Sequence, residues 1–311
     1  MSAGPLVSIC LPVRNGRDLI ERALDSALAQ DYEPIEIVVV DDNSSDGTAE
    51  LVRTVYGDRV RLFANDVARG LCGNHDAVVS RAHGDFIKFL HHDDFLAASC
   101  VAKMAEALLA NPTAGIAFCR RAIELEDGSE AAQDWLDRYR APHRHFAQLA
   151  PINSGEDVFR EWLARGFPDN WIGEPVTVMV RRSSLRRAGR FNPHSRQMMD
   201  IDLWMRILAH HDAAFIDEEL VTYRHSEASS TGRTMEGRRN WLDPLWMLEA
   251  LTADDELVAR HPELESMRRV RRREAFRTAV RRAVRLPPEL RFAKDWATYE
   301  RHRARKLLRT A

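Results

Sequence analysis

Short apolar segments alternate with amphipathic ones along the first 120 residues of the chain. Segments rich in β-branched residues have the length of buried strands at 6–13, 35–40, 60–63, 86–90 and 114–119. Apolar residues at helical spacing predict helices at 17–29, 48–56, 71–82 and 99–110. Repeated strand–helix units with nearly all-apolar strands predict an α/β fold with a doubly wound, mostly parallel sheet flanked by helices.

The pattern changes beyond about residue 120. Residues 126–151 are polar and rich in His and Arg, and we expect a long loop with some helix there. Further helices are predicted at 156–165 and 201–209, and short strands at 177–180, 213–216 and 220–223. From residue 240 onward the pattern is wholly helical. We therefore expect three parts: 1–125, a continuation of the same domain at 126–235, and a helical C-terminal region at 236–311.

Composition limits the classes of protein. The 311 residues, 45% of them hydrophobic, can bury a sizeable core. A net charge of -2 gives no sign of nucleic-acid binding. The four cysteines form neither a CxxC pair nor a zinc-binding spacing, so we expect buried free thiols in a reducing compartment. Because no segment resembles a signal peptide or a membrane span, we expect a cytoplasmic protein, with any membrane contact peripheral and at the inner face.

Polar residues follow three of the predicted strands where each strand ends. They are Arg14, Asn15 and Gly16 after the first strand, Asp41 and Asp42 at the second, and His91, His92, Asp93 and Asp94 after 86–90. Because the carboxyl ends of parallel strands meet at one edge of a sheet, we expect these residues to surround one ligand. Adjacent carboxylates there suit a divalent metal that carries a diphosphate. Neither a GxGxxG fingerprint nor a Walker A loop follows the first strand.

Each of these segments also has a simpler structural interpretation. Residues 14–16 fit an ordinary strand–helix turn, and residues 43–48 fit a turn that caps the next helix. Asp94 fits the N-cap of a helix from Leu96 to Ala110, an explanation as good as metal binding from spacing alone. The combination of three strand ends is more specific than any one of them.

Longer segments around these residues resemble the inverting family 2 of the GT-A glycosyltransferases. LVSICLPVRNG is similar to the first strand of that family, and IEIVVVDDNSSDGT to its second strand and turn. RGLCGNHDAVVSRAHGDFIKFLHHDD resembles the helix and strand that lead to its Asp-x-Asp motif. MMDIDLWMRI resembles the helix of its catalytic base, and VTYRHSEASS a segment close to its metal. The resemblance ends at about residue 230.

The resemblance implies transfer of a sugar, with inversion, from a UDP- or dTDP-linked donor to a hydroxyl of a glycan or lipid-linked acceptor, assisted by Mn²⁺ or Mg²⁺. It implies that Asp200 is the catalytic base and that Asp93, Asp94 and His225 hold the metal. The residues that it places at the donor are Pro12, Val13, Arg14, Asn15, Asp42, Asn74, His92 and Asp93. Without it, Asp200 fits an acid that complements a helix dipole, and His225 fits a structural histidine.

Three residues depart from the pattern of that family. Arg14 stands where an aromatic residue is usual, and Met199 stands where a Glu often precedes the base. His91 stands where the Asp-x-Asp motif begins, so one carboxylate ligand is missing. His91 or His92 could replace it as a softer ligand.

The acceptor side and the C-terminal region carry weaker signals. Trp171 could stack on a sugar and Glu174 could bind its hydroxyls, with a core Trp at a domain seam as an equal alternative. The Arg-rich segment 266–285 could rest on anionic lipid, although a solvated helix in a bundle or a homodimer contact explains it better. Two other functions stay open: a sugar-phosphate nucleotidyltransferase, and a non-catalytic nucleotide-sugar-binding protein.

Overall fold

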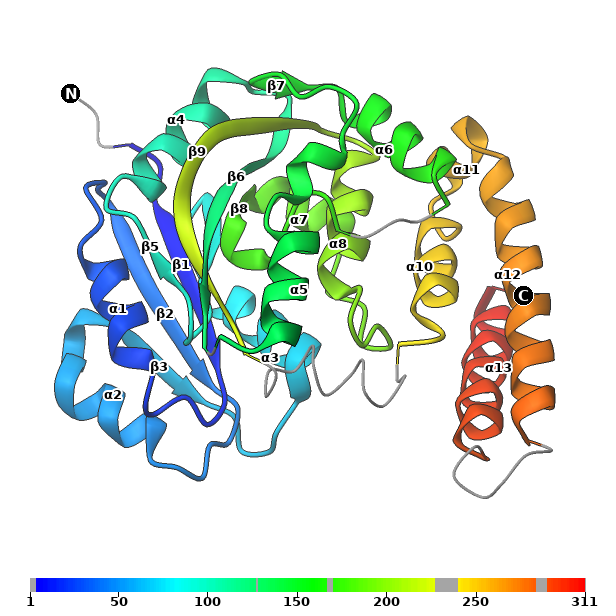
Figure 1. Cartoon of the computed structure of the whole chain (residues 1–311), viewed down its shortest axis with the longest axis horizontal. Helices are drawn as coiled ribbons and strands as arrows, with labels where there is room; N and C mark the ends of the chain where they lie inside the picture. The colour runs from blue at the N-terminus through cyan, green and yellow to red at the C-terminus, as the bar shows by residue number, and fades with distance from the viewer. Residues whose placement is uncertain (1–3, 127, 167–169, 227–239, 284–289, 311) are drawn as a thin grey trace. The chain divides into compact units, whose positions relative to one another are not determined.

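The computed structural model describes residues 4–126, 128–166, 170–226, 240–283 and 290–310. The chain divides into two compact units, Met1–Asn240 and Trp241–Ala311. The first unit contains a nine-stranded sheet with helices around it, and the second unit is helical (Figure 1).

Four parallel strands form the N-terminal half of the sheet. In spatial order they are β3 (Arg61–Ala64), β2 (Ile35–Asp41), β1 (Val7–Val13) and β4 (Phe86–Phe89). The last residues of β1 and β2, Val13 and Asp41, are neighbours in the register. These strands therefore end at the same edge of the sheet, where polar loops follow them.

The other half of the sheet is mixed. From β4 outward, its strands are β8 (Val178–Arg181), β6 (Ala114–Leu125), β9 (Asp212–His225) and β5 (Phe95–Leu96), and β7 (Ile152–Asn153) pairs with β9. β8 is antiparallel to β4 and to β6, whereas β6 and β9 are parallel and curve side by side (Figure 1). The predicted mostly parallel, doubly wound sheet is thus confirmed.

Helices pack on both faces of the sheet. Those of the first unit are α1 (Ile20–Leu28), α2 (Thr48–Tyr56), α3 (Gly70–Arg81), α4 (Cys100–Ala110), α5 (Glu130–Tyr139), α6 (Gly155–Ala164), α7 (Arg182–Ala188) and α8 (Met199–Leu208), with 3₁₀ turns at Gly57–Arg59, Pro142–His145 and Pro175–Thr177. Apolar residues of α1, α2 and α4 share one core with Phe86 of β4. Phe89 points to the opposite face, where it contacts His75 of α3 and Trp204 of α8.

The second unit has its own small core. Its helices are α10 (Asp243–Leu251), α11 (Asp255–Arg260), α12 (Glu263–Ala283) and α13 (Leu290–Thr310). Trp246 and Tyr299 lie at the centre of that core. None of the helices in the described ranges combines the length and the apolar composition that a membrane crossing needs. All four cysteines, which belong to the first unit, are free and buried, as predicted.

One region differs from the prediction. The helix expected within residues 126–151 is present as α5, but the two short strands expected at 213–216 and 220–223 are one strand, β9. Between the two expected strands, Asp217 and Glu219 form ion pairs with Arg120 of β6 at an irregularity in the ladder. A charged partner on the neighbouring strand therefore keeps a polar stretch extended.

Candidate active site

The loops that follow β1 and β2 hold each other in place. Asn15 has a φ of 52°, and its side-chain oxygen accepts a hydrogen bond from the Ser45 N–H at 2.9 Å. Gly16 lies against the loop after β4, because a Cβ at Gly16 would stand 2.6 Å from the His92 ring. The structure therefore brings together the ends of β1, β2 and β4, as well as the polar residues that follow them. Arg14 is exposed, and Pro12 and Val13 are buried in β1.

Asp42, which is only 1% exposed, holds the start of α3 through hydrogen bonds to its carboxylate. Its Oδ1 accepts hydrogen bonds from Asn65 Nδ2 and from the Arg69 N–H, each at 2.8 Å, and its Oδ2 accepts one from the Gly70 N–H at 2.9 Å. Asn74 extends this network: its Oδ1 accepts from Asn65, and its Nδ2 donates to main-chain carbonyls at the ends of β1 and β2. Asp42 and Asn74 thus tie the strand ends to α3.

His91, Asp93 and Asp94 form a potential metal site. Each offers one ligand atom, and these atoms lie within 4.8 Å of one another. Asp94 is 1% exposed, and its Oδ1 accepts a hydrogen bond from the Arg224 N–H at 3.0 Å. Its buried Oδ2 receives no hydrogen bond and lies 3.3 Å from His91 Nδ1. In the described part of the chain, nothing donates to the Asp93 carboxylate either. These oxygens fit a hard divalent cation.

Asp94 does not cap a helix, so the simpler interpretation of this segment is wrong. The two residues after it form β5, where Phe95 pairs with Thr222 of β9. The next helix, α4, begins only at Cys100. The carboxylate therefore faces the backbone of β9, and its second oxygen is left for another ligand.

Burial and mutual charge shift the pKa values of this group. Burial raises the pKa of Asp94 to about 6, against the lowering influence of His91. Burial alone would lower the pKa of His91, but the negative charges of Asp94, Asp93 and Asp200 raise it overall. Burial lowers the pKa of His92. The Asp200 carboxylate is thus among the charges that act on His91 of the metal site.

Asp200 lies in the first turn of α8 and is partly buried. Its Oδ2 accepts a hydrogen bond from Asn170 Nδ2 at 2.9 Å, and its Oδ1 accepts one from the Ile201 N–H at 2.7 Å. Asn170 is itself held by Gly173, whose N–H donates to Asn170 Oδ1 at 3.0 Å. Burial raises the pKa of Asp200 to about 7, and the charge of Glu174 adds to the rise. Such a carboxyl can accept a proton near neutral pH.

The two residues predicted at the acceptor side are largely engaged within the protein. Glu174 forms an ion pair with the buried Arg121, which also donates to the carbonyl of Tyr139 at 2.7 Å. Trp171 is 3% exposed, and its ring packs edge-on against Phe146. This burial favours the alternative of a packed Trp over a ring that is open to a sugar.

The structure does not bring His225 into the group formed by His91, Asp93 and Asp94. Its ring stacks on Trp135, with 3.8 Å between the ring centroids and 8° between the planes. The residue before it, Arg224, reaches Asp94 through its backbone N–H. The last residues of the VTYRHSEASS segment, 227–230, lie outside the described residues.

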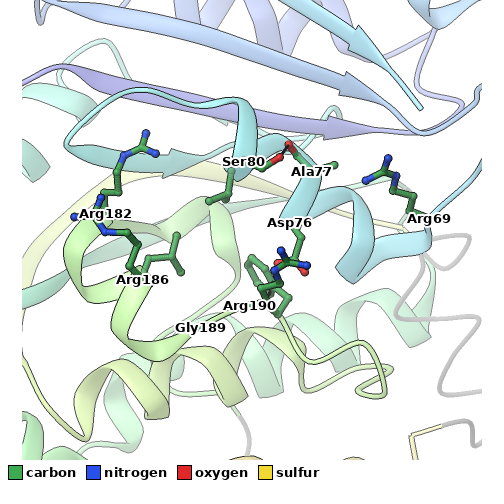
Figure 2. A pocket seen from close by; sticks show the side chains of 11 residues that line it. Arg69, Asp76, Ala77, Ser80, Arg182, Arg186, Gly189 and Arg190 are labelled. Atoms are coloured by element: carbon green, nitrogen blue, oxygen red, sulfur yellow. Dashed lines mark hydrogen bonds between the residues drawn. The ribbon is translucent and has the colours of Figure 1, made fainter. Parts of the chain in front are cut away.

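A cavity of about 490 Å³ lies elsewhere, between α3 and α7. Figure 2 shows Arg182 and Arg186 at one end, Arg69 at the other, and Asp76 between them. Because the guanidinium groups are spread along the cavity, they do not converge on a single anion. None of the three residues of the metal site lines it.

Sequence comparisons place this chain in a known family. Residues 8–168 match the family model described as Glycosyl transferase family 2. The chain is 36% identical over 252 residues to the uncharacterized protein MT1568 of Mycobacterium tuberculosis, covering 81% of this chain and 77% of that protein. It is 33% identical over 231 residues to an uncharacterized glycosyltransferase of Rickettsia felis, covering 73% of this chain but only 35% of that protein.

Solved structures share the fold. Staphylococcus aureus TarS, in complex with UDP-GlcNAc, matches with a TM-score of 0.61 at 16% identity, over 94% of this chain and 78% of that one. The mannosyltransferase PcManGT of Pyrobaculum calidifontis, in complex with GDP-Man and Mn²⁺, matches with a TM-score of 0.56 at 20% identity, over 96% and 81%. The family match, the relatives and the GT-A fold agree, and the chain is a glycosyltransferase that belongs to glycosyl transferase family 2.

Proposed function

We propose that this glycosyltransferase is an inverting, metal-dependent enzyme that transfers a sugar from a UDP- or dTDP-linked donor to a hydroxyl of a glycan or lipid-linked acceptor. One observation carries the proposal: a carboxyl with a pKa of about 7, Asp200, lies within electrostatic reach of the His91–Asp93–Asp94 group. A base within electrostatic reach of a cation site is what this transfer needs.

Asp200 would accept the proton of the acceptor hydroxyl. As the acceptor oxygen bonds to the anomeric carbon, the bond from that carbon to the diphosphate breaks, which inverts the configuration. Asn170 orients the carboxylate through the hydrogen bond at 2.9 Å, and the Ile201 N–H holds its other oxygen. A divalent cation held by His91, Asp93 and Asp94 would supply positive charge to the departing diphosphate.

The nucleoside would lie at the ends of β1 and β2. The Asp42 carboxylate accepts three hydrogen bonds from the protein and has capacity for one more, which a base N–H could use. Arg14 and Asn15 are exposed beside it and could contact the base or the ribose. The neighbouring structures, solved with UDP-GlcNAc and with GDP-Man and Mn²⁺, support a nucleoside diphosphate sugar as donor and a divalent metal.

A donor screen tests the proposal. Release of the nucleoside diphosphate is measured with UDP-, dTDP- and GDP-linked sugars in Mn²⁺ or Mg²⁺, in the wild type and in Asp93→Ala. Release that depends on Asp93 supports transfer. Incorporation of pyrophosphate into a nucleotide sugar would instead indicate a nucleotidyltransferase, and tight binding without turnover across all donors would indicate a binding protein.

For location, we propose peripheral contact of a cytoplasmic enzyme with the inner face of a membrane that carries a lipid-linked acceptor. On α12, Val270, Phe276 and Val280 are about half exposed among arginines. Ala279, on the same helix, is buried. Flotation of the full chain with anionic and with neutral vesicles tests this, and a dimer in solution would assign the exposed residues to a second copy.

A further inference from the structure

We infer that His75 is a positioning residue for the metal site: it fixes the tautomer of His91, so that His91 presents the lone pair of its Nδ1 beside Asp93 and Asp94. His75 lies in α3, outside the metal-site group. The inference rests on the proposed metal role and adds a residue that acts on the metal only through another side chain.

The hydrogen bonds of His75 determine which of its nitrogens carries the proton. Nδ1 lies 2.8 Å from the carbonyl oxygen of Leu71, one turn earlier in α3, and a carbonyl can only accept. Nδ1 of His75 therefore carries the hydrogen. The ring is 1% exposed and packs against Phe89 and Phe191, so burial keeps it neutral. Nε2 of His75 is then an acceptor.

The same reasoning determines which nitrogen of His91 carries the hydrogen. Its Nε2 lies 3.0 Å from His75 Nε2, and a hydrogen bond between two ring nitrogens needs one donor. Because His75 Nε2 accepts, His91 Nε2 must donate. The other nitrogen of His91, Nδ1, is directed at the buried Asp94 Oδ2, which has no hydrogen bond and is 3.3 Å away. In neutral His91, a lone pair and an unpartnered carboxylate oxygen therefore face each other, an arrangement that a cation stabilises.

The substitution of His for the usual Asp at position 91 explains why such a residue is needed. Either oxygen of a carboxylate can bind a metal, whereas an imidazole must present the correct nitrogen without its hydrogen. The rings of His75 and His91 meet edge to face, with 5.2 Å between their centroids, so the orientation is fixed as well. One nitrogen and two carboxylates form a softer site than three carboxylates, and this site should favour Mn²⁺ or Co²⁺ over Mg²⁺.

The test measures Mn²⁺ binding to the full chain in the presence of UDP, by the electron paramagnetic resonance of free Mn²⁺. His75→Leu removes the acceptor at similar volume, and we expect it to weaken Mn²⁺ binding by about 10–100-fold. His75→Gln, whose side-chain oxygen can still accept from His91 Nε2, should lose less Mn²⁺ affinity than His75→Leu. Electron spin-echo spectroscopy of bound Mn²⁺ should show a ¹⁴N coupling in the wild type that is lost or altered in His75→Leu.

His91→Asp provides the matched control, because a carboxylate has no tautomer to fix. In that background His75→Leu should change Mn²⁺ affinity by less than about twofold if the two residues act as one unit. Equal losses in both backgrounds would make His75 a packing residue and overturn the inference, as would an unchanged affinity and ¹⁴N coupling in His75→Leu. A wild type that binds no Mn²⁺ with UDP would overturn the proposed metal role as well, which distinguishes the two failures.

Discussion

The amide of Asn170 donates a hydrogen bond to the carboxylate of Asp200 across 30 positions of the chain, at 2.9 Å. Asn170 is held in turn by both polar groups of the Gly173 backbone, because its Nδ2 also donates to the Gly173 carbonyl at 2.7 Å. The proposed base is therefore oriented by a short irregular segment as well as by the Ile201 N–H of its own helix.

Replacing Asp200 by Asn should abolish transfer without weakening the binding of the donor. The substitution removes the proton acceptor and keeps the shape of the side chain, so we expect turnover to fall by about 10²–10⁴-fold. Affinity for UDP, measured by calorimetry, should stay within about twofold of the wild type. Unchanged turnover in this variant would remove Asp200 from the mechanism.

The pH dependence of the rate should report Asp200. Since burial raises its pKa to about 7, the fraction in the base form, and hence the rate at saturating substrate, should rise as the pH passes through about 7. The rising limb should be absent from the residual activity of Asp200→Asn. A profile that is flat between pH 5 and 9 in the wild type would contradict the assignment.

The same pKa predicts a cost in stability. The folded state holds the Asp200 proton more tightly than the unfolded state does. The stabilisation that results is fully present below the pKa of an aspartate in the unfolded chain, and it is lost as the pH rises to about 7. Asp200→Asn should therefore stabilise the protein at pH 8, by roughly 2–4 kcal/mol, and have little effect at pH 4. Urea unfolding at both pH values measures the difference, and equal effects at the two would argue against a raised pKa.

Asn170→Ala should slow transfer and shift its pH profile upward. The hydrogen bond from Asn170 lowers the pKa of Asp200, so its removal raises that pKa further and leaves the carboxylate less well oriented. We expect a loss of about 10–100-fold in turnover, with unchanged UDP affinity. Asn111→Ala, at the end of α4, is the matched control and should leave the pH profile unchanged.

Asp42→Ala should destabilise the first unit. The Asn65 amide and the N–H groups of Arg69 and Gly70 would lose their acceptor, which should cost roughly 2–4 kcal/mol. Urea unfolding of the full chain measures this, and the loss of stability should come with weaker UDP binding. A variant with wild-type stability would show that the network is not needed to hold α3.

Chelation should remove activity reversibly. With EDTA we expect transfer to stop and to return on addition of excess Mn²⁺, because His91, Asp93 and Asp94 would bind the cation reversibly. Addition of Mn²⁺ and UDP should also raise the thermal midpoint of the wild type more than that of Asp93→Ala. Full activity in chelator would mean that the metal role is wrong.

The regular elements of the first unit were predictable because their periodicities are local. The apolar runs that became β1, β2 and β4 and the amphipathic segments that became α1 and α4 depend on neighbours within a few residues. The residues that organise the site depend on distant partners instead. Asn65 contacts Asp42, and His75 contacts His91, through hydrogen bonds that join separate elements. No spacing in the sequence marks such pairings between distant residues.

Helix α3 is held at its first turn by Asp42 and carries His75 about one and a half turns further on. Because one continuous helix joins the two sites, a displacement of its amino end would be expected to reach the imidazole pair. We therefore expect binding of the nucleoside beside Asp42 and the geometry of the metal site beside His91 to be coupled.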